Sequence, residues 1–316
     1  MPSQTPETIG PYSVRELLGK AGQSKVYKAA DPQGDPVAVK LFPSRLTADP
    51  AAVERFHREL AAVGPVSRHP NLVHVLGTGQ EGDGLYLAME LVEGTSLDRV
   101  LKQRRVSLPE AFAVMRGICR ALAHAHQHGF VHRSLTPRNV LVSPDFSTVK
   151  VSDLGATGFE SSPNLTATLS TGEIRLGALY YLPPEILEGQ GKGDARADIY
   201  SAGVIFHEML TGRSPGPKFA LPSQLNSELP PDVDVVVLTC LDRQPEDRYA
   251  NAGDLLAALE RLEETLRLRV LTEIRGISQA GSRLLGGSEG GGRKTWLYMG
   301  LALVIVLAVL GYWLTR

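Results

Sequence analysis

Hydrophobic positions along the chain follow two different spacings. Apolar residues recur at helical spacing over residues 111–125 and 255–277, whereas residues 140–142 and 149–151 are short apolar runs of strand length. Strand-length runs followed by longer helical segments are typical of a mixed domain in which strands and helices share one core. The pattern therefore predicts an α+β fold.

The helical segment at residues 255–277 is amphipathic. Leu255, Leu259, Leu262 and Leu266 repeat every three or four residues and would share one face of the helix. We expect the first part of this segment to pack on the preceding domain. The part from Leu266 onward either packs there too, extends toward a membrane or pairs with a second copy of the chain, which would make a homodimer.

A second kind of apolar segment occupies residues 296–314, where 19 residues carry no charge. At about 1.5 Å per residue, a helix of this length spans a hydrocarbon core of about 30 Å. Aromatic residues mark both ends, as they do in spanning helices: Trp296, Tyr298, Tyr312 and Trp313. The segment predicts a single transmembrane helix; a buried helix of a soluble domain is the alternative.

The flanks of this segment predict its orientation. A glycine-rich stretch at residues 286–292 is typical of a flexible linker. Arg293 and Lys294 precede the apolar segment, and Arg316 alone follows it with Thr315. Because basic residues favour the cytoplasmic side, we expect a cytoplasmic domain before the helix and the C-terminus just outside.

Composition narrows the functional classes. The 316 residues have a formal net charge of −1 and are 43% hydrophobic, enough for one domain with a sizeable core. A neutral balance gives no support for nucleic-acid binding. Cys119 and Cys240 lie in apolar helical patterns and are expected to be buried thiols, not a disulfide.

A polar loop between the helical pattern at 111–125 and the strand at 140–142 carries the most specific signal. It reads His132-Arg133-Ser134-Leu135-Thr136-Pro137-Arg138-Asn139. This stretch resembles the catalytic loop H-R-D-L-x-x-x-N of protein kinases. Ser134 stands where that family has the Asp that accepts the substrate proton, and Thr136 stands where its Ser/Thr members have a Lys.

Other motifs of the same family follow in the same order. Those before the loop are Val37-Ala38-Val39-Lys40, Glu59 in the helical segment 51–63, and the strand and hinge at residues 85–92. Those after it are Asp153-Leu154-Gly155, Pro183-Pro184-Glu185, the segment 198–203 that begins with Asp198, and Arg248. The chain is thus identified as similar to the bacterial Ser/Thr kinases. The resemblance implies a two-lobed domain at residues 11–265, divided near residue 92, then an extension and linker at 266–295.

The resemblance also implies the site residues. Nucleotide would be bound by Leu18, Gly19, Val26, Ala38, Lys40, Glu59, Met89, Glu90, Val92 and Leu141, with Lys40 paired to Glu59. Magnesium would be bound by Asn139 and Asp153. The glycine loop departs from G-x-G-x-x-G-x-V, because Ala21 and Ser24 replace its second and third glycines. We expect its hairpin to form and to cover ATP less closely.

The departures favour a membrane-anchored pseudokinase that binds MgATP and regulates or scaffolds another protein, such as a kinase or its substrate, at a bacterial inner membrane. Residues 213–232 also lack a helix-length apolar pattern where the family usually docks protein substrates, although a simple deletion would look the same. One alternative is an active but weak Ser/Thr kinase, favoured by the retention of Lys40, Glu59, Asn139 and Asp153. A scaffold that binds no nucleotide is the other.

Overall fold

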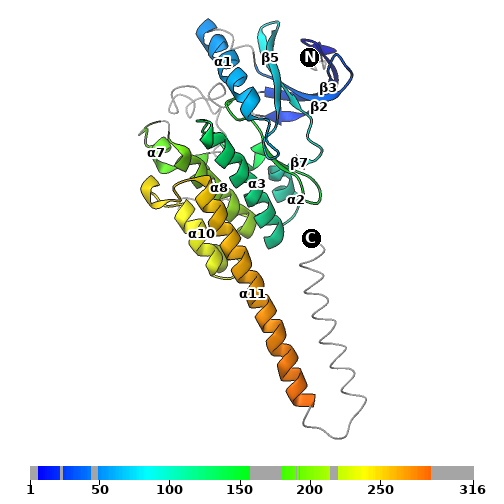
Figure 1. Ribbon diagram of the computed structural model, residues 1–316. Helices are drawn as coiled ribbons and strands as arrows, with labels where there is room; N and C mark the ends of the chain where they lie inside the picture. Colours follow the sequence, from blue (N-terminus) through cyan, green and yellow to red (C-terminus); the bar gives the residue numbers. More distant parts are fainter. Residues whose placement is uncertain are drawn as a thin grey trace.

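The computed structural model describes residues 6–21, 24–43, 49–156, 179–189, 191, 193–213 and 220–285, with α11 side chains described to residue 272. These residues form two lobes, as predicted (Figure 1). The predicted linker at 286–292 and the apolar segment at 296–314 lie outside the described residues. None of the helices within the described residues combines the length and the apolar character that crossing a bilayer requires.

The N-terminal lobe is built on a six-stranded antiparallel sheet in the order β1-β2-β3-β4-β6-β5. Its strands are β1 (Thr8–Ile9), β2 (Tyr12–Ala21), β3 (Ser24–Ala30), β4 (Pro36–Leu41), β5 (Val75–Glu81) and β6 (Gly84–Glu90). Strand β6 is buried on both faces because its alternate side chains enter two cores. Tyr86 and Ala88 pack with β3 and β4, whereas Leu85, Leu87 and Met89 pack toward a helix.

That helix is α1 (Pro50–Val66). Asp49 caps it by accepting a hydrogen bond of 3.0 Å from the backbone N–H of Ala51, and Pro50 fits the first turn, where no N–H is needed. Phe56 and Leu60 are buried against the sheet. The predicted helix at 51–63 is confirmed, with one more turn at its end.

The C-terminal lobe surrounds two helices, α3 (Leu108–Gln127) and α8 (Ala195–Thr211). A capping box at Ser107 and Glu110 begins α3, and most of α8 is buried, so α8 forms the centre of the lobe. The remaining strands are β7 (Thr95–Ser96), β8 (Val140–Val142) and β9 (Val149–Val151). The remaining helices are α2 (Leu97–Gln103), η2 (Pro137–Asn139), α7 (Pro184–Leu187), α9 (Pro222–Leu225), α10 (Asp232–Cys240), η3 (Pro245–Asp247) and α11 (Ala252–Leu285).

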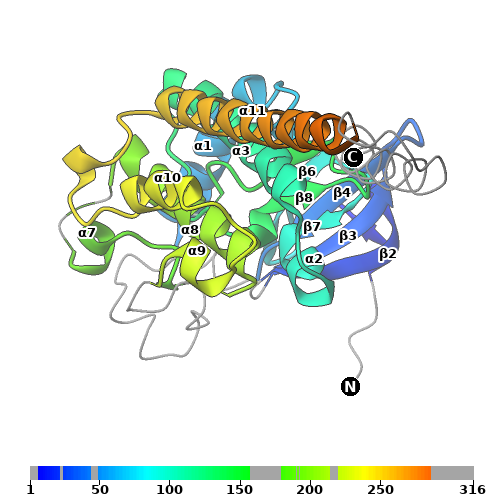
Figure 2. The same cartoon turned by 90° about the horizontal axis from the view of Figure 1, so that it is seen from below.

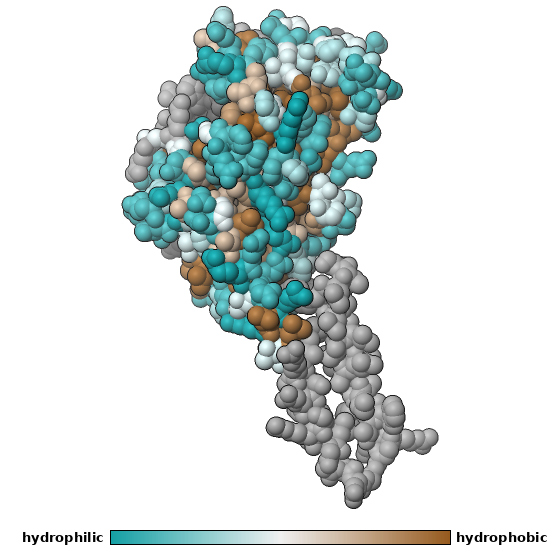
Figure 3. Space-filling model, in the orientation of Figure 1, coloured by the Kyte–Doolittle hydropathy of each residue, from teal (hydrophilic) through white to brown (hydrophobic). Residues whose placement is uncertain are grey.

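Helix α11 lies along α3 and then continues past the lobe (Figures 1 and 2). The four leucines of the predicted apolar face, Leu255, Leu259, Leu262 and Leu266, are all buried, which confirms their packing on the domain. Leu268 and Leu271 are 53% and 37% exposed, and apolar surface gathers where the described side chains of α11 end (Figure 3). The helix therefore packs up to about Leu266 and extends beyond it.

The segment expected to lack a docking helix is only partly described. Residues 214–219 lie outside the described part, and residues 220–231 contain the four-residue helix α9. Pro222 begins α9, and the chain turns away again at Asn226. Where it is described, the segment thus has one turn of helix in place of the longer element.

Candidate functional site

Helix α8 supports the backbone of the loop that contains Ser134. The buried carboxylate of Asp198 accepts hydrogen bonds from the backbone N–H of His132 at 2.8 Å and of Arg133 at 2.7 Å. It also contacts His126 Nε2 at 2.7 Å. Arg133 has φ of 64°, a left-handed conformation that a non-glycine residue adopts only when such contacts hold it. Asp198 thus supports the backbone of the loop.

Ser134 faces an imidazole and not a carboxylate. Its Oγ lies 3.4 Å from His132 Nδ1, and His132 Nε2 lies 2.9 Å from the carbonyl oxygen of Ser152. Because a carbonyl only accepts, Nε2 carries the proton, so in the neutral ring Nδ1 accepts the Ser134 hydroxyl proton. The loop therefore offers an incoming substrate hydroxyl the Oγ of Ser134, an oxygen that is not a strong base.

Four predicted site residues form one chain of hydrogen bonds. Lys40 Nζ contacts Asp153 Oδ1 at 3.0 Å, and Asn139 Nδ2 donates to Asp153 Oδ2 at 2.9 Å. Thr136 Oγ1 donates to Asn139 Oδ1 at 2.8 Å. Strand β4, the turn η2 and the residues after β9 therefore converge on one point between the lobes.

Lys40 and Asp153 are the charged side chains of this hydrogen-bond chain. Burial opposes the ionisation of Asp153, but the charge of Lys40 and its hydrogen bond outweigh that cost, so the pKa of Asp153 lies below its usual value. Lys40 is 2% exposed and Asp153 13% exposed. The site thus holds a carboxylate that stays ionised, beside a buried cation.

The donor set fits Mg²⁺. Asp153 and Asn139 supply a carboxylate and a carbonyl oxygen, the hard ligands that this ion prefers, and phosphates and water usually complete its shell. Among the described residues there is no group of three or more His, Cys, Asp or Glu that could hold a metal. Asp153 and Asn139 would thus hold the cation, with phosphate and water oxygens as its further ligands.

The apolar residues predicted to contact nucleotide also lie together. Ala38 and Met89 are paired across β4 and β6, and both belong to the core under α1. The half-buried side chains of Val26, Val92 and Leu141 pack against the same core. These residues thus belong to one apolar cluster, which adjoins Lys40 on β4.

The glycine loop forms a hairpin in its described part, as expected. Gly19 pairs with Val26 and Ala21 with Ser24, and residues 22–23 lie outside the described part. The carbonyl of Leu18, whose side chain is 36% exposed, accepts a hydrogen bond of 3.1 Å from Arg99 on α2. Sequence reasoning missed Arg99, because nothing in the pattern around an exposed Arg on a short helix indicates a contact 81 residues away.

Glu90 has a structural use that the sequence did not reveal. Its carboxylate accepts from Lys150 Nζ at 2.6 Å and from the backbone N–H of His74 at 2.9 Å. Its side chain therefore fastens the segment between the lobes to β9, and only its backbone remains for a nucleotide.

The pairing expected between Lys40 and Glu59 requires correction. Within the described residues no ion pair joins them, and Lys40 is paired with Asp153. Lys40 instead meets the carboxylate of Asp153, which follows β9. Helix α1 packs on the same segment, because Leu60 and Val63 face Gly155, where an added Cβ would lie 2.7 Å from Val63 Cγ2.

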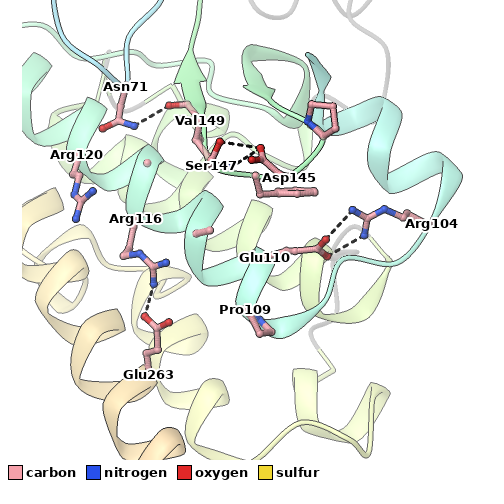
Figure 4. A pocket seen from close by; sticks show the side chains of 14 residues that line it. Asn71, Arg104, Pro109, Glu110, Arg116, Arg120, Asp145, Ser147, Val149 and Glu263 are labelled. Atoms are coloured by element: carbon pink, nitrogen blue, oxygen red, sulfur yellow. Dashed lines mark hydrogen bonds and ion pairs between the residues drawn. The ribbon is translucent and has the colours of Figure 1, made fainter. Parts of the chain in front are cut away.

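No carboxylate from the next turn replaces the missing base. Asp145 lies between β8 and β9, where Ser143 and Ser147 donate hydrogen bonds to it and lower its pKa to about 2. It lines a pocket of about 800 Å³ whose walls are the outer face of α3 and Glu263 of α11 (Figure 4). Asp145 is therefore directed to this pocket and its own turn, and not to the loop with Ser134.

Glu185 and Arg248, which belong to two of the motifs, form an ion pair. Two parallel hydrogen bonds of 2.8 Å join the guanidinium to the carboxylate, and Arg248 also lies over the ring of Tyr200 at 5.0 Å. Its Nε donates to the carbonyl of Asp242 at 2.8 Å. The pair fastens α7, which follows the site segment, to the end of the lobe.

Comparison with known proteins gives one consistent result. The family model described as protein kinase domain matches residues 12–269. Serine/threonine-protein kinase PknL of Mycobacterium tuberculosis is 36% identical over 276 residues, which cover 81% of this chain and 67% of PknL. A Clostridium acetobutylicum protein described as a probable serine/threonine-protein kinase is 31% identical over 268 residues, 80% of this chain and 40% of that protein.

Solved structures agree on the fold. The kinase domain of Mycobacterium tuberculosis PknI superposes with a TM-score of 0.65 over 80% of this chain and 96% of that domain. At 24% sequence identity, this likeness speaks for the fold alone. The relatives that match in sequence extend well beyond the matched region, so their full activities do not transfer directly.

Proposed function

Because the chain belongs to the protein kinase family and carries a domain of the bacterial Ser/Thr type, we propose that it binds MgATP but transfers phosphate poorly or not at all. In this proposal it acts as a membrane-anchored pseudokinase that regulates or scaffolds a partner protein. The observation that carries it is the hydrogen-bond chain from Lys40 to Thr136, intact for binding, next to a loop whose base is Ser134.

Nucleotide binding is supported by charge and shape together. Lys40 would pair with phosphates, and Asp153 and Asn139 would hold Mg²⁺, which neutralises phosphate charge when bound. The apolar surface of Val26, Ala38 and Met89 would receive the base. These groups lie on three rigid elements of the fold and are already close to one another.

Impaired transfer is supported by two substitutions. A positioned general base contributes about 10²–10⁴ in rate, and Ser134 has a hydroxyl, which is not a strong base, where the family has a carboxylate. Thr136 carries no charge and is directed to Asn139, so it does not offer the cation that the family's Lys gives to the transferred phosphate.

A weak but active Ser/Thr kinase is the second candidate. The same hydrogen bonds support it, because Lys40, Asp153 and Asn139 contact one another although the neighbouring loop departs from the family pattern. A scaffold that binds no nucleotide gains nothing from this arrangement.

The membrane, the orientation and the partner belong to the proposal as well. The uncharged segment at 296–314, with Arg293 and Lys294 before it, favours one spanning helix and a cytoplasmic domain in a bacterial inner membrane. The exposed Leu268 and Leu271 on α11 leave room for a partner protein or a second copy.

MgATP is expected to raise the unfolding temperature of the full-length protein. At about 100 times the dissociation constant, a ligand stabilises the folded state by about 2.7 kcal/mol. Asp153→Ala should remove this effect, whereas Asp145→Ala, which removes an exposed carboxylate in the pocket behind α3, should preserve it. Thermal unfolding with and without MgATP measures both.

A transfer assay on the same proteins separates the two candidates. With radiolabelled ATP and a generic protein substrate, the pseudokinase proposal expects no turnover above that of Asp153→Ala. Robust turnover that Asp153→Ala abolishes would overturn it in favour of the active kinase. The absence of any shift with MgATP would favour the scaffold that binds no nucleotide.

A further inference from the structure

We propose that Thr136 is a positioning residue that withholds Asn139 from the metal and so raises the Mg²⁺ concentration at which nucleotide binds. The inference rests on the proposed binding of ATP. In the sequence, Thr136 is notable only because it replaces a Lys of the family. In the structure, its hydroxyl forms a hydrogen bond with Asn139, and we assign a function to that bond.

The orientation of the Asn139 amide follows from its two partners. An ionised carboxylate can only accept, so the group that contacts Asp153 at 2.9 Å must be the NH₂ of Asn139. The carbonyl oxygen Oδ1 then faces Thr136, whose hydroxyl donates to it at 2.8 Å. The reverse orientation would place two oxygens against each other at Asp153, so the amide has one stable arrangement.

Each oxygen that could bind the cation accepts one hydrogen bond and keeps a second lone pair, but Asn139 turns its NH₂ toward Asp153 and its Oδ1 toward Thr136. Asp153 Oδ1 accepts from Lys40, Asp153 Oδ2 from Asn139, and Asn139 Oδ1 from Thr136. The backbone of Asn139 cannot adjust easily, since its carbonyl accepts from the N–H of Ser152 at 2.8 Å and its N–H donates to the carbonyl of Thr136 at 3.0 Å. For Asn139 to bind a metal, its side chain must rotate and the hydrogen bond from Thr136 must break.

The use of the Thr136 hydroxyl is specific to this contact. Thr136 is the residue before η2, where a Thr usually caps the backbone, yet no side-chain cap hydrogen bond is formed there. The hydroxyl sits on a β-branched carbon with few rotamers, so its direction toward Asn139 is well defined. A Lys at this position would carry its donors at the end of a long flexible chain and would not hold Asn139 in this way.

The expected size of the effect is that of one neutral hydrogen bond. Such a bond contributes a net amount equivalent to about a 2- to 13-fold change in an equilibrium constant. Removing the Thr136 donor should therefore lower the half-saturating Mg²⁺ concentration by about 2- to 13-fold. The affinity for ATP without divalent cation should stay the same, because Thr136 reaches Asn139 and not the apolar surface.

The test compares Thr136→Val with Thr136→Ser in the full-length protein. Valine keeps the shape of the side chain and removes its donor, whereas serine keeps the donor. The unfolding midpoint is recorded at a fixed ATP concentration while Mg²⁺ is titrated, and again with ATP in EDTA. Thr136→Ala repeats the removal with a smaller side chain if the valine variant does not fold.

The expected result is a lower half-saturating Mg²⁺ concentration for Thr136→Val and an unchanged one for Thr136→Ser. If the wild type and Thr136→Val have the same half-saturating Mg²⁺ concentration and ATP stabilises both, the proposed role of Thr136 is overturned. The proposed binding of ATP is not affected by that outcome. A change of equal size in EDTA also overturns the role of Thr136, because the effect would then lie on the nucleotide and not on the metal. A lack of stabilisation by ATP in all the proteins overturns the proposed function, and the role of Thr136 with it.

Discussion

Restoring the family residues by Ser134→Asp together with Thr136→Lys is expected to raise phosphoryl transfer by about 10²–10⁴-fold. The loop backbone is already fixed by Asp198, through His132 and Arg133. A carboxylate at position 134 therefore starts from the backbone position that a general base needs. The lysine at 136 adds a cation beside the transferred phosphate and at the same time releases Asn139.

The measurement is the initial rate of phosphate transfer at saturating MgATP. Ser134→Asn with Thr136→Lys is the matched control, because asparagine has the size of aspartate but cannot take a proton. A rate for the aspartate double variant no higher than that of this control would mean that a base is not what the loop lacks. Activity that is already high in the wild type would mean that another group serves as the base.

Removing Arg248 from the Glu185–Arg248 pair is expected to lower the free energy of unfolding more than removing the arginine of a surface ion pair. The Arg248 side chain is 0% exposed and Glu185 is 14% exposed, so Arg248→Met leaves a carboxylate without its partner in a largely buried place. Breaking a buried pair in this way typically costs about 3–5 kcal/mol. The variant also loses the hydrogen bond to Asp242 and the contact with Tyr200.

Chemical unfolding of Arg248→Met measures this cost. A matched control is Arg243→Met, which breaks a surface pair with Glu188 whose side chains are 73% and 42% exposed. Such surface pairs contribute about 0–1 kcal/mol. A loss for Arg248→Met within the range of the control would show that the buried pair is not a strong stabilising contact. Adding Glu185→Gln to Arg248→Met should recover part of the loss, because it removes the unpaired charge.

Acid should weaken the same contact. Burial opposes the ionisation of Glu185, but the hydrogen bond and the charge of Arg248 outweigh it, so the pKa of Glu185 lies below its usual value. A lowered pKa in the folded state gives stability that is present above the unfolded pKa and is lost as the pH falls through the folded one. The difference in stability between wild type and Arg248→Met should therefore shrink as the pH falls below about 4.3.

Local patterns predicted much of the fold. The spacing of Leu255, Leu259 and Leu262 predicted which face of α11 is buried, and the order of the motifs predicted both lobes. Contacts between residues of one motif could also be predicted from the sequence. The hairpin that pairs Gly19 with Val26 is an example. These features depend on period and order, which the sequence displays directly.

Other features depend on how elements sit against one another. The motifs predicted a pair of Lys40 with Glu59, but Lys40 is paired with Asp153. The motifs also identified Thr136 only as the loss of a cation, and the position of Asn139 shows that the Thr136 hydroxyl donates a hydrogen bond to it. These contacts depend on how β4, the loop and the residues after β9 are placed in space, and no pattern along the chain records that placement.

The extension of α11 has a mechanical consequence. Beyond Arg269, which is still paired with Asp232 of α10, the helix continues for about 24 Å to its end at Leu285, at 1.5 Å per residue. The end of the helix is therefore held away from the surface of the lobe. If the chain is anchored in a bilayer, this spacer increases the distance from the lipid surface that the nucleotide site can reach. Partners farther from the lipid would then be within reach of the site.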